Sequence, residues 1–366
     1  MCRLLAAVIL VVFLHSAYGE CLPKDPKRPS LAAQLGQTLL LGFHGTNLAD
    51  PDLQWLRDGI AEGTIGGVVL FSYNIVSHEQ IRQLVSDLRT IPCRYPLFIG
   101  VDQEGGAVAR LSPDKGFPGF PSPAEVGRKF RPAAAYRLYI SMSRELRETG
   151  FNLNFAPLLD LEYPVSPVIG QLGRSFSKDP AAVVALATAF IRAHRQSGVL
   201  TVVKHFPGHG SAASDTHLSS ADVTDLWGGR ELFPFREIVR RGLADMVMTG
   251  HLFNAKVDSK YPASLSRLHV EGILRGKLGY RGVVISDDMQ MDAVRRNYSF
   301  GDAAIAALSS GTDILLYGNF MDKYDTNLPA KFRSAVENAL ADGRMDPEDV
   351  YRAFQRVVTL KKRLSR

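Results

Sequence analysis

Short apolar runs rich in β-branched residues alternate along the chain with longer stretches that have a helical hydrophobic period. Eight of these runs have the length of buried strands and are apolar on both faces, as in parallel sheets. They cover residues 40–45, 66–72, 97–102, 151–157, 199–204, 245–250, 282–287 and 313–318. Helices are expected between them, because Ser77 and Gln80 can form a capping box and Gly150 and Gly198 follow amphipathic stretches.

Eight strands alternating with helices predict an α/β fold, a (β/α)8 TIM barrel. A doubly wound open sheet is the alternative. The chain has 366 residues, 46% of them hydrophobic, and can bury a large core. No low-complexity linker divides it, so we expect a single domain over residues 20–366.

The first nineteen residues differ in character from the rest of the chain. Arg3 precedes an apolar run over residues 4–14, and Ala17, Tyr18 and Gly19 then precede Glu20. This pattern is typical of a secretory signal peptide at 1–19. The run is shorter than the about 20 apolar residues that span a bilayer. We therefore expect export to a periplasmic or extracellular location without a stable membrane anchor; retention of an uncleaved signal is the alternative.

Charge and cysteine content add little specific chemistry. A net charge of +6 arises from 43 basic and 37 acidic residues without a run of like charge, which argues against nucleic acid as a partner. We expect a monomer. Cys21 and Cys93 would remain after signal cleavage and could pair in an oxidising compartment, or stay as two thiols.

Polar residues follow the predicted strands, and in a barrel the loops after the strands meet at one face. These residues are His44, Asp102, Glu104, Arg110, Asp160, Arg174, Lys204, His205, His251, Asp287 and Asp288. Each alone is explained as a solvated or ion-paired side chain. Their repetition at successive strand ends indicates a site for a polar, hydroxyl-rich ligand.

The loop after the fifth strand is rich in titratable groups. Lys204 and His205 end that strand, and a proline and two glycines then force the chain out of regular structure. Asp215 and His217 follow, separated by one residue. A carboxylate so placed can orient an imidazole and raise its basicity, so this pair could act as a general acid/base.

A zinc site is the competing use of this loop. Its candidate ligands are His205, His209, Asp215 and His217. Pro207 and Gly208 break the helical turn that an HxxxH pair would need, which makes zinc the weaker interpretation.

Four ordered motifs carry a resemblance to a known family: VDQEGG at 101–106, KHFPGHG at 204–210, SDTH at 214–217 and ISDDM at 285–289. Together they resemble glycoside hydrolase family 3, in its single-domain β-N-acetylglucosaminidase branch, over about residues 33–320. The resemblance implies a retaining exo-β-N-acetylhexosaminidase that acts on carbohydrate and uses no metal or organic cofactor.

The resemblance also implies roles for individual residues. Asp287 corresponds to the nucleophile, with Asp288 the less favoured carboxylate, and His217 with Asp215 to the acid/base dyad that this branch uses in place of a second carboxylate. The implied sugar-binding residues are Asp102, Arg110, Arg174, Lys204 and His205.

Two departures from the family pattern affect what carries over. Family members usually have an arginine where this chain has Ala107, and the segment VIGQLGRSF is two residues longer than its family counterpart. The second departure could change how Arg174 is presented. The implied substrate is a terminal β-linked N-acetylglucosamine, in peptidoglycan fragments during wall turnover or in chito-oligosaccharides, and the residues do not choose between them.

Other activities stay open at this point. Within the family they are a β-N-acetylglucosaminide phosphorylase, in which phosphate replaces water, and a β-glucosidase. From other classes they are a Schiff-base aldolase that uses Lys204 and a sugar-binding protein without catalysis.

Overall fold

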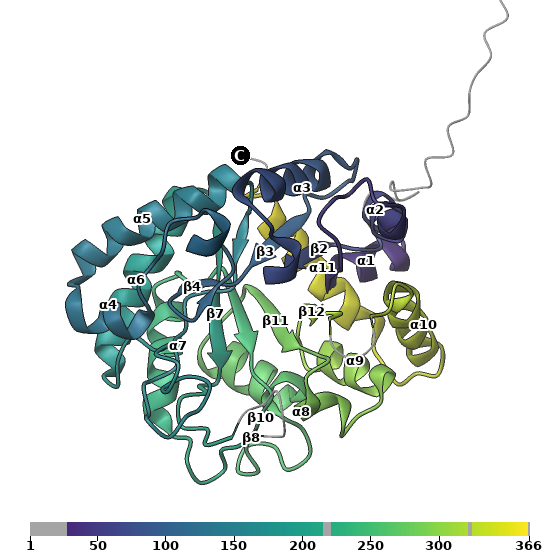
Figure 1. The fold of residues 1–366 in the computed structure, drawn as a ribbon. Helices are drawn as coiled ribbons and strands as arrows, with labels where there is room; N and C mark the ends of the chain where they lie inside the picture. The colour runs from purple at the N-terminus through teal and green to yellow at the C-terminus, as the bar shows by residue number, and fades with distance from the viewer. Residues whose placement is uncertain (1–27, 215–220, 321–323, 365–366) are drawn as a thin grey trace, which may run out of the picture.

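The computed structural model describes residues 28–214, 221–320 and 324–364. Within these ranges, parallel strands form a closed barrel in the order β1-β12-β11-β9-β7-β6-β3-β2 (Figure 1). The barrel closes where β1 pairs with β12, with Leu39 beside Leu315. The predicted single-domain TIM barrel is confirmed, and the open-sheet alternative is wrong.

Each predicted strand overlaps one barrel strand. The barrel strands are β1 (Leu39–Gly42), β2 (Gly67–Leu70), β3 (Phe98–Val101), β6 (Leu153–Asn154), β7 (Leu200–Phe206), β9 (Met246–Thr249), β11 (Val283–Asp288) and β12 (Ile314–Tyr317). The predicted run at 151–157 yields only the two residues of β6. Pro157 lies inside that run and has no N–H to donate to a neighbouring strand, so regular pairing does not continue through it.

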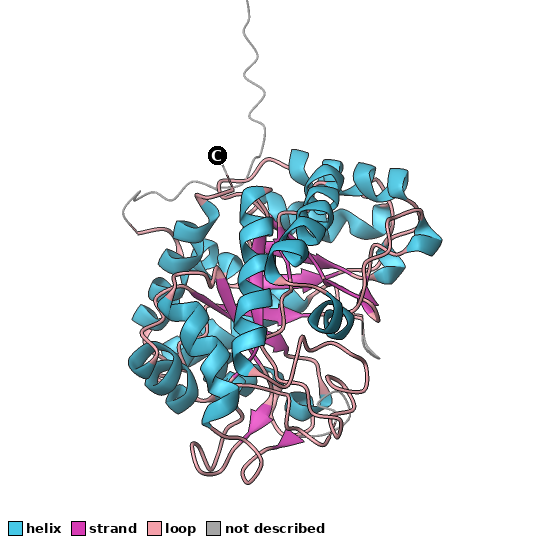
Figure 2. Ribbon diagram, turned by 90° about the vertical axis from the view of Figure 1, so that its left-hand side faces the viewer, coloured by secondary structure: helices cyan, strands magenta, loops and turns pink. Residues whose placement is uncertain are grey.

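Helices surround the strands, as the view from the side shows (Figure 2). They are α1 (Leu31–Gln37), α2 (Gln54–Ala61), α3 (His78–Thr90), α4 (Pro123–Lys129), α5 (Pro132–Thr149), α6 (Pro180–Gln196), α7 (Gly229–Arg240), the π-helical η5 (Leu268–Lys277), α8 (Asp292–Arg295), α9 (Phe300–Ser309), α10 (Leu328–Ala341) and α11 (Pro347–Lys361). Two short strand pairs lie outside the barrel: β4 (Gln103–Gly105) with β5 (Val108–Ala109), and β8 (Ala221–Asp222) with β10 (Leu252–Phe253).

The predicted helix ends follow local chemistry. Ser77 caps α3, because its hydroxyl accepts a hydrogen bond from the N–H of Gln80 at 3.2 Å. The Gln80 side chain accepts from the N–H of Val76 at 2.9 Å, so the return half of the capping box is shifted by one residue. Gly150 ends α5 with a φ of +103°, a left-handed conformation that favours glycine.

Side chains from all eight barrel strands form one buried apolar cluster. Val357 and Leu360 of α11 belong to the same cluster. The next residue, Lys361, donates hydrogen bonds of 2.6 Å to the Gln37 side chain and to the Gly66 carbonyl, just before β2 begins. Helix α11 therefore covers the amino-terminal end of the strands, which leaves the opposite end for a site.

Several predictions fall outside the described residues. The predicted signal peptide at 1–19, Cys21, Asp215 and His217 all lie there. Cys93 is described, and its thiol donates a hydrogen bond to the Tyr95 carbonyl at 3.0 Å. The pairing of Cys21 with Cys93 stays a prediction. Among the described helices, none has the length and apolar character of a membrane span.

Candidate active site

A cavity of about 320 Å³ lies at the carboxyl ends of the barrel strands. It brings together the six described residues that the resemblance assigns to catalysis or sugar binding: Asp102, Arg110, Arg174, Lys204, His205 and Asp287. These residues come from four separate parts of the chain and meet because the carboxyl ends of the strands open on one face of the barrel. Of the other polar residues predicted at the strand ends, Asp288 also lines the cavity, whereas His44, Glu104, Asp160 and His251 do not.

Lys204 lies at the centre of an ion-pair network. Its ammonium is 2.9 Å from Asp102 Oδ1 and 2.8 Å from Glu104 Oε1, and its side chain is buried. Burial alone would lower the pKa of Lys204, but the two carboxylates outweigh it and the pKa is raised. Lys204 is therefore a fixed cation and not a neutral amine.

Asp102 is held by the hairpin that follows it. The chain turns from β3 into β4 and β5, and Arg110 then lies 3.4 Å from Asp102 Oδ2. Burial favours a raised pKa for Asp102, but Lys204 and Arg110 hold this pKa well below its usual range. Gly106 is needed in the turn, since its φ is +61° and a Cβ there would lie 2.5 Å from the Ser122 Cβ.

Glu104 and Arg174 form a bidentate pair. Arg174 Nε and Nη2 donate to the two Glu104 oxygens at 2.9 and 2.7 Å, and Arg174 Nη1 donates to the Val168 carbonyl at 3.0 Å. The longer VIGQLGRSF segment thus still delivers Arg174 to the cavity. The same segment contributes Leu172 to the cavity wall.

His205 is oriented by a buried carboxylate. His205 Nδ1 lies 2.7 Å from Asp160 Oδ2, while the backbone N–H groups of His205 and His209 donate to Asp160 Oδ1 at 3.1 and 2.8 Å. Burial would raise the pKa of Asp160, but the neighbouring histidines and hydrogen bonds lower it. An ionised Asp160 only accepts hydrogen bonds, so His205 carries a proton on Nδ1.

The two carboxylates at the end of β11 have different surroundings. Asp288 is 7% exposed, and its Oδ1 accepts hydrogen bonds from the N–H groups of Gln290 and Gly318, both at 2.9 Å. Asp287 is more exposed, and its Oδ1 accepts from the Asp288 N–H at 2.8 Å. Both line the cavity. Asp288 is therefore the more buried of the two carboxylates and is held by backbone N–H groups, whereas Asp287 is the more accessible one.

The loop after β7 is anchored on α7 and on the segment just before it. Ser211 donates to the Glu231 carboxylate through both its backbone N–H and its hydroxyl, and Trp227 Nε1 donates to the Pro207 carbonyl at 3.0 Å. Burial raises the pKa of Glu231 to about 7. These contacts fix Pro207 and Ser211, which precede Asp215 and His217 in the sequence.

The candidate zinc ligands are divided by the limits of the described residues. Over 28–214, 221–320 and 324–364, no three His, Cys, Asp or Glu side chains are grouped as a metal site. His205 and His209 lie in these ranges, and His209 has its pKa lowered to about 4, mainly by burial. The other two candidate ligands lie outside them, so the zinc interpretation is untested.

Sequence reasoning missed the pairings and the apolar wall. Arg174 pairs with Glu104 and His205 with Asp160, contacts that join positions 70 and 45 residues apart. Phe71 and Phe320 also line the cavity. Both follow a barrel strand closely, which is the signal that could have identified them.

Comparison with known proteins shows the family of this chain. Residues 33–360 match the family model of the glycosyl hydrolase family 3 N-terminal domain. A beta-hexosaminidase of Tolumonas auensis is 38% identical over 287 residues, which cover 77% of this chain and 82% of the relative.

Two solved structures are similar over most of the chain. A family 3 beta-N-acetylglucosaminidase from a Paenibacillus species has a TM-score of 0.83 and 34% identity, covering 92% of this chain and 63% of that one. A beta-N-acetylhexosaminidase from Beutenbergia cavernae has a TM-score of 0.81 and 30% identity, covering 91% and 98%.

A closed (β/α)8 barrel with carboxylates and fixed cations at the carboxyl ends of its strands is an arrangement that glycosidases use. This chain belongs to glycoside hydrolase family 3. Within that family it is a β-N-acetylhexosaminidase.

Proposed function

We propose that this enzyme removes terminal β-linked N-acetylglucosamine with retention of configuration, using Asp287 as nucleophile and His217 with Asp215 as acid/base. The observation that carries the proposal is the placement of Asp287 in one cavity with the network of Lys204, Asp102 and Arg110. This placement supports the proposal, because a carboxylate that could attack the sugar faces the same cavity as side chains that could bind it.

The polar network suits one sugar ring bound in a fixed orientation. The charges of Asp102, Glu104, Lys204 and Arg174 are paired among themselves. Their side chains are therefore held in place before substrate binds, and sugar hydroxyls meet donors and acceptors that need little reorganisation. We infer that Asp102, Arg110, Arg174, Lys204 and His205 bind the terminal sugar.

The proposed reaction has two steps. Asp287 attacks the anomeric carbon, the glycosidic C–O bond breaks, and His217 gives its proton to the departing oxygen. His217 then takes a proton from water, which displaces Asp287 from the glycosyl-enzyme and restores the β configuration. The contacts of Glu231 and Trp227 with the loop after β7 support this role, because they secure the segment from which His217 would act.

The state of Lys204 argues against the aldolase alternative. A Schiff-base lysine must reach its carbonyl substrate as a neutral amine. Lys204 is instead bound between Asp102 and Glu104, and its pKa is raised. A cation held in this way suits a sugar ligand and not a nucleophile.

The predicted signal peptide at 1–19 supports a proposal about the biological setting. We infer export to the periplasm or the cell exterior from Arg3 and the apolar run at 4–14. We propose peptidoglycan fragments or chito-oligosaccharides as substrates, because both can carry terminal β-linked N-acetylglucosamine.

Product analysis by proton NMR tests the proposal. The enzyme should release β-configured N-acetylglucosamine first from an aryl β-N-acetylglucosaminide, with the α anomer appearing later by mutarotation. Lack of turnover, an α product at first, or faster cleavage of the matching aryl β-glucoside would overturn it.

A further inference from the structure

Aromatic rings form a row that begins in the wall of the catalytic cavity. Phe71 and Phe320 line the cavity, with ring centroids 4.7 Å apart. Tyr73 lies 5.6 Å from Phe71, His44 lies 4.7 Å from Tyr73, and Tyr324 lies 4.6 Å from His44. The rings form an unbroken series of contacts that leads away from the cavity.

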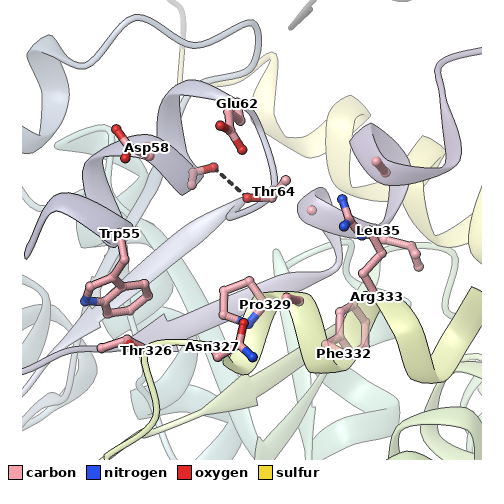
Figure 3. A pocket seen from close by; sticks show the side chains of 14 residues that line it. Leu35, Trp55, Asp58, Glu62, Thr64, Thr326, Asn327, Pro329, Phe332 and Arg333 are labelled. Atoms are coloured by element: carbon pink, nitrogen blue, oxygen red, sulfur yellow. Dashed lines mark hydrogen bonds between the residues drawn. The ribbon is translucent and has the colours of Figure 1, made fainter. Parts of the chain in front are cut away.

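The row continues to a second cavity. Trp55 lies 6.3 Å from Tyr324 and lines a space of about 200 Å³ between α1, α2 and α10. Figure 3 shows the Trp55 indole on one side of this space and Arg333 on the other, with Asn327 between them. The two cavities are thus joined by aromatic side chains.

The row is contiguous because its members follow neighbouring barrel strands. His44 comes after β1, Phe71 and Tyr73 after β2, and Phe320 with Tyr324 after β12. These three strands are adjacent in the barrel, in the order β12-β1-β2. Their loops therefore place aromatic side chains on one side of the barrel mouth.

The row is open to solvent. Tyr73, Phe320 and Tyr324 are 39%, 37% and 38% exposed, although all three are large and apolar over most of their surface. Clustered aromatic surface at the mouth of a site marks a binding surface more often than isolated exposed rings do.

We propose that this aromatic row binds the sugar rings of the leaving group, so that the enzyme prefers chito-oligosaccharides of three or more units to a disaccharide. The proposal rests on the function proposed above. An exo-acting site holds the terminal sugar at its end, and the rest of the chain leaves through the mouth. Pyranose rings carry C–H groups that make favourable apolar contacts with aromatic side chains.

The first test separates the bound sugar from the leaving group. N-acetylglucosaminyl azide has a leaving group too small to reach the row, whereas chitobiose places a sugar there. Tyr73→Ala should lower the ratio of kcat/KM for chitobiose to that for the azide by about tenfold. Tyr73→Phe should keep the wild-type ratio, because it preserves the ring.

The second test uses chain length. The wild-type kcat/KM should rise from chitobiose to chitotriose, and Tyr324→Ala should reduce the rise while changing the chitobiose value less. Tyr136→Ala is the matched control, since Tyr136 lies on α5, where its hydroxyl pairs with Gln196. It should leave both ratios at wild-type values.

The outcomes separate this inference from the proposed function. Failure of the wild type to cleave the azide, chitobiose and an aryl glycoside would reject the hexosaminidase proposal itself. Three results would reject binding by the aromatic row. They are a wild-type kcat/KM that does not depend on chain length, kcat/KM ratios that stay unchanged in Tyr73→Ala and Tyr324→Ala, and equal losses in Tyr73→Phe and Tyr73→Ala. Faster cleavage of a peptide-bearing disaccharide than of chitotriose would also overturn the preference for chito-oligosaccharides.

Discussion

Lys204 Nζ lies 2.9 Å from Asp102 Oδ1, across 102 residues of sequence, and this contact joins β7 to the residue that follows β3 in the lining of the cavity. It makes the lysine a permanent cation and the aspartate a permanent anion. A sugar bound there meets both charges in fixed positions.

Removal of Lys204 should affect all substrates alike. Lys204→Ala should lower kcat/KM roughly 10- to 100-fold, the scale of one or two hydrogen bonds to a charged group. The loss should be the same for dinitrophenyl and sugar leaving groups, since the lysine acts on the bound sugar and not on the departing oxygen. Steady-state kinetics with both substrates measures this.

The same variant should be less stable, because Asp102 and Glu104 lose their shared cation. Breaking a buried ion pair from one side costs about 3–5 kcal/mol. Lys129→Ala is the control, since Lys129 is exposed on α4 and pairs only with Glu125 among the described residues. Urea unfolding should show a large loss for Lys204→Ala and almost none for the control, and equal stability of the two would contradict the ion-pair network.

Glu231 should make the stability of the enzyme depend on pH. Its folded-state pKa is raised from 4.5 to about 7, mainly by burial. A raised carboxyl pKa means that the folded state holds the proton more tightly. Protonated Glu231 therefore contributes to the free energy of unfolding below about pH 4.5. This contribution, roughly 3 kcal/mol in total, is lost as the pH rises towards 7.

Glu231→Gln should flatten this profile, because an amide does not titrate. The measurement is the free energy of unfolding in urea between pH 4.5 and 7. Glu237→Gln, on the same helix but with a lowered pKa, should keep the wild-type slope in that window. A wild-type slope in Glu231→Gln would show that another group is responsible.

His217 should matter most when the leaving group is poor. His217→Ala should lose about 10²- to 10⁴-fold on chitobiose, the usual scale of general acid catalysis. The loss should be much smaller in the glycosylation burst of a dinitrophenyl glycoside, which departs with little help. Asp215→Asn should show the same pattern more weakly. Equal losses on both substrates would indicate binding or metal coordination and would reopen the zinc interpretation.

Water should be the acceptor in the second step. A neutral imidazole repels phosphate less than a carboxylate would, so phosphorolysis must be tested directly. Products formed at millimolar phosphate should be free N-acetylglucosamine, measured against its 1-phosphate by chromatography. A mixture dominated by the 1-phosphate would make the enzyme a phosphorylase.

The barrel could be predicted from the sequence because buried parallel strands are apolar on both faces. Each of the eight apolar runs overlaps one barrel strand. Residues at strand ends such as Asp102, Lys204 and Asp287 could be placed on one face for the same reason. Their individual partners could not. Asp160 reaches His205 and Glu104 reaches Arg174 only through the curvature of the closed sheet and the path of long loops.

The sequence could have indicated members of the aromatic row, but not the row itself. Phe71 and Phe320 follow barrel strands closely and could have been placed at the barrel mouth, but no local period links them to Tyr73 or Tyr324. Their proximity depends on closure of the barrel between β12 and β1, which brings the last strand beside the first. Only the folded chain shows that three loops share one surface.

The identity of the nucleophile is the central claim, and covalent trapping tests it most directly. A fluorinated N-acetylglucosamine analogue with a good leaving group should form a glycosyl-enzyme that accumulates, since fluorine slows its hydrolysis. Peptide mass spectrometry with fragmentation should place the sugar on Asp287, and Asp287→Asn should remain unlabelled and inactive while folding normally. A label on Asp288, whose Oδ1 accepts two backbone N–H groups in the structure, would contradict the proposed mechanism.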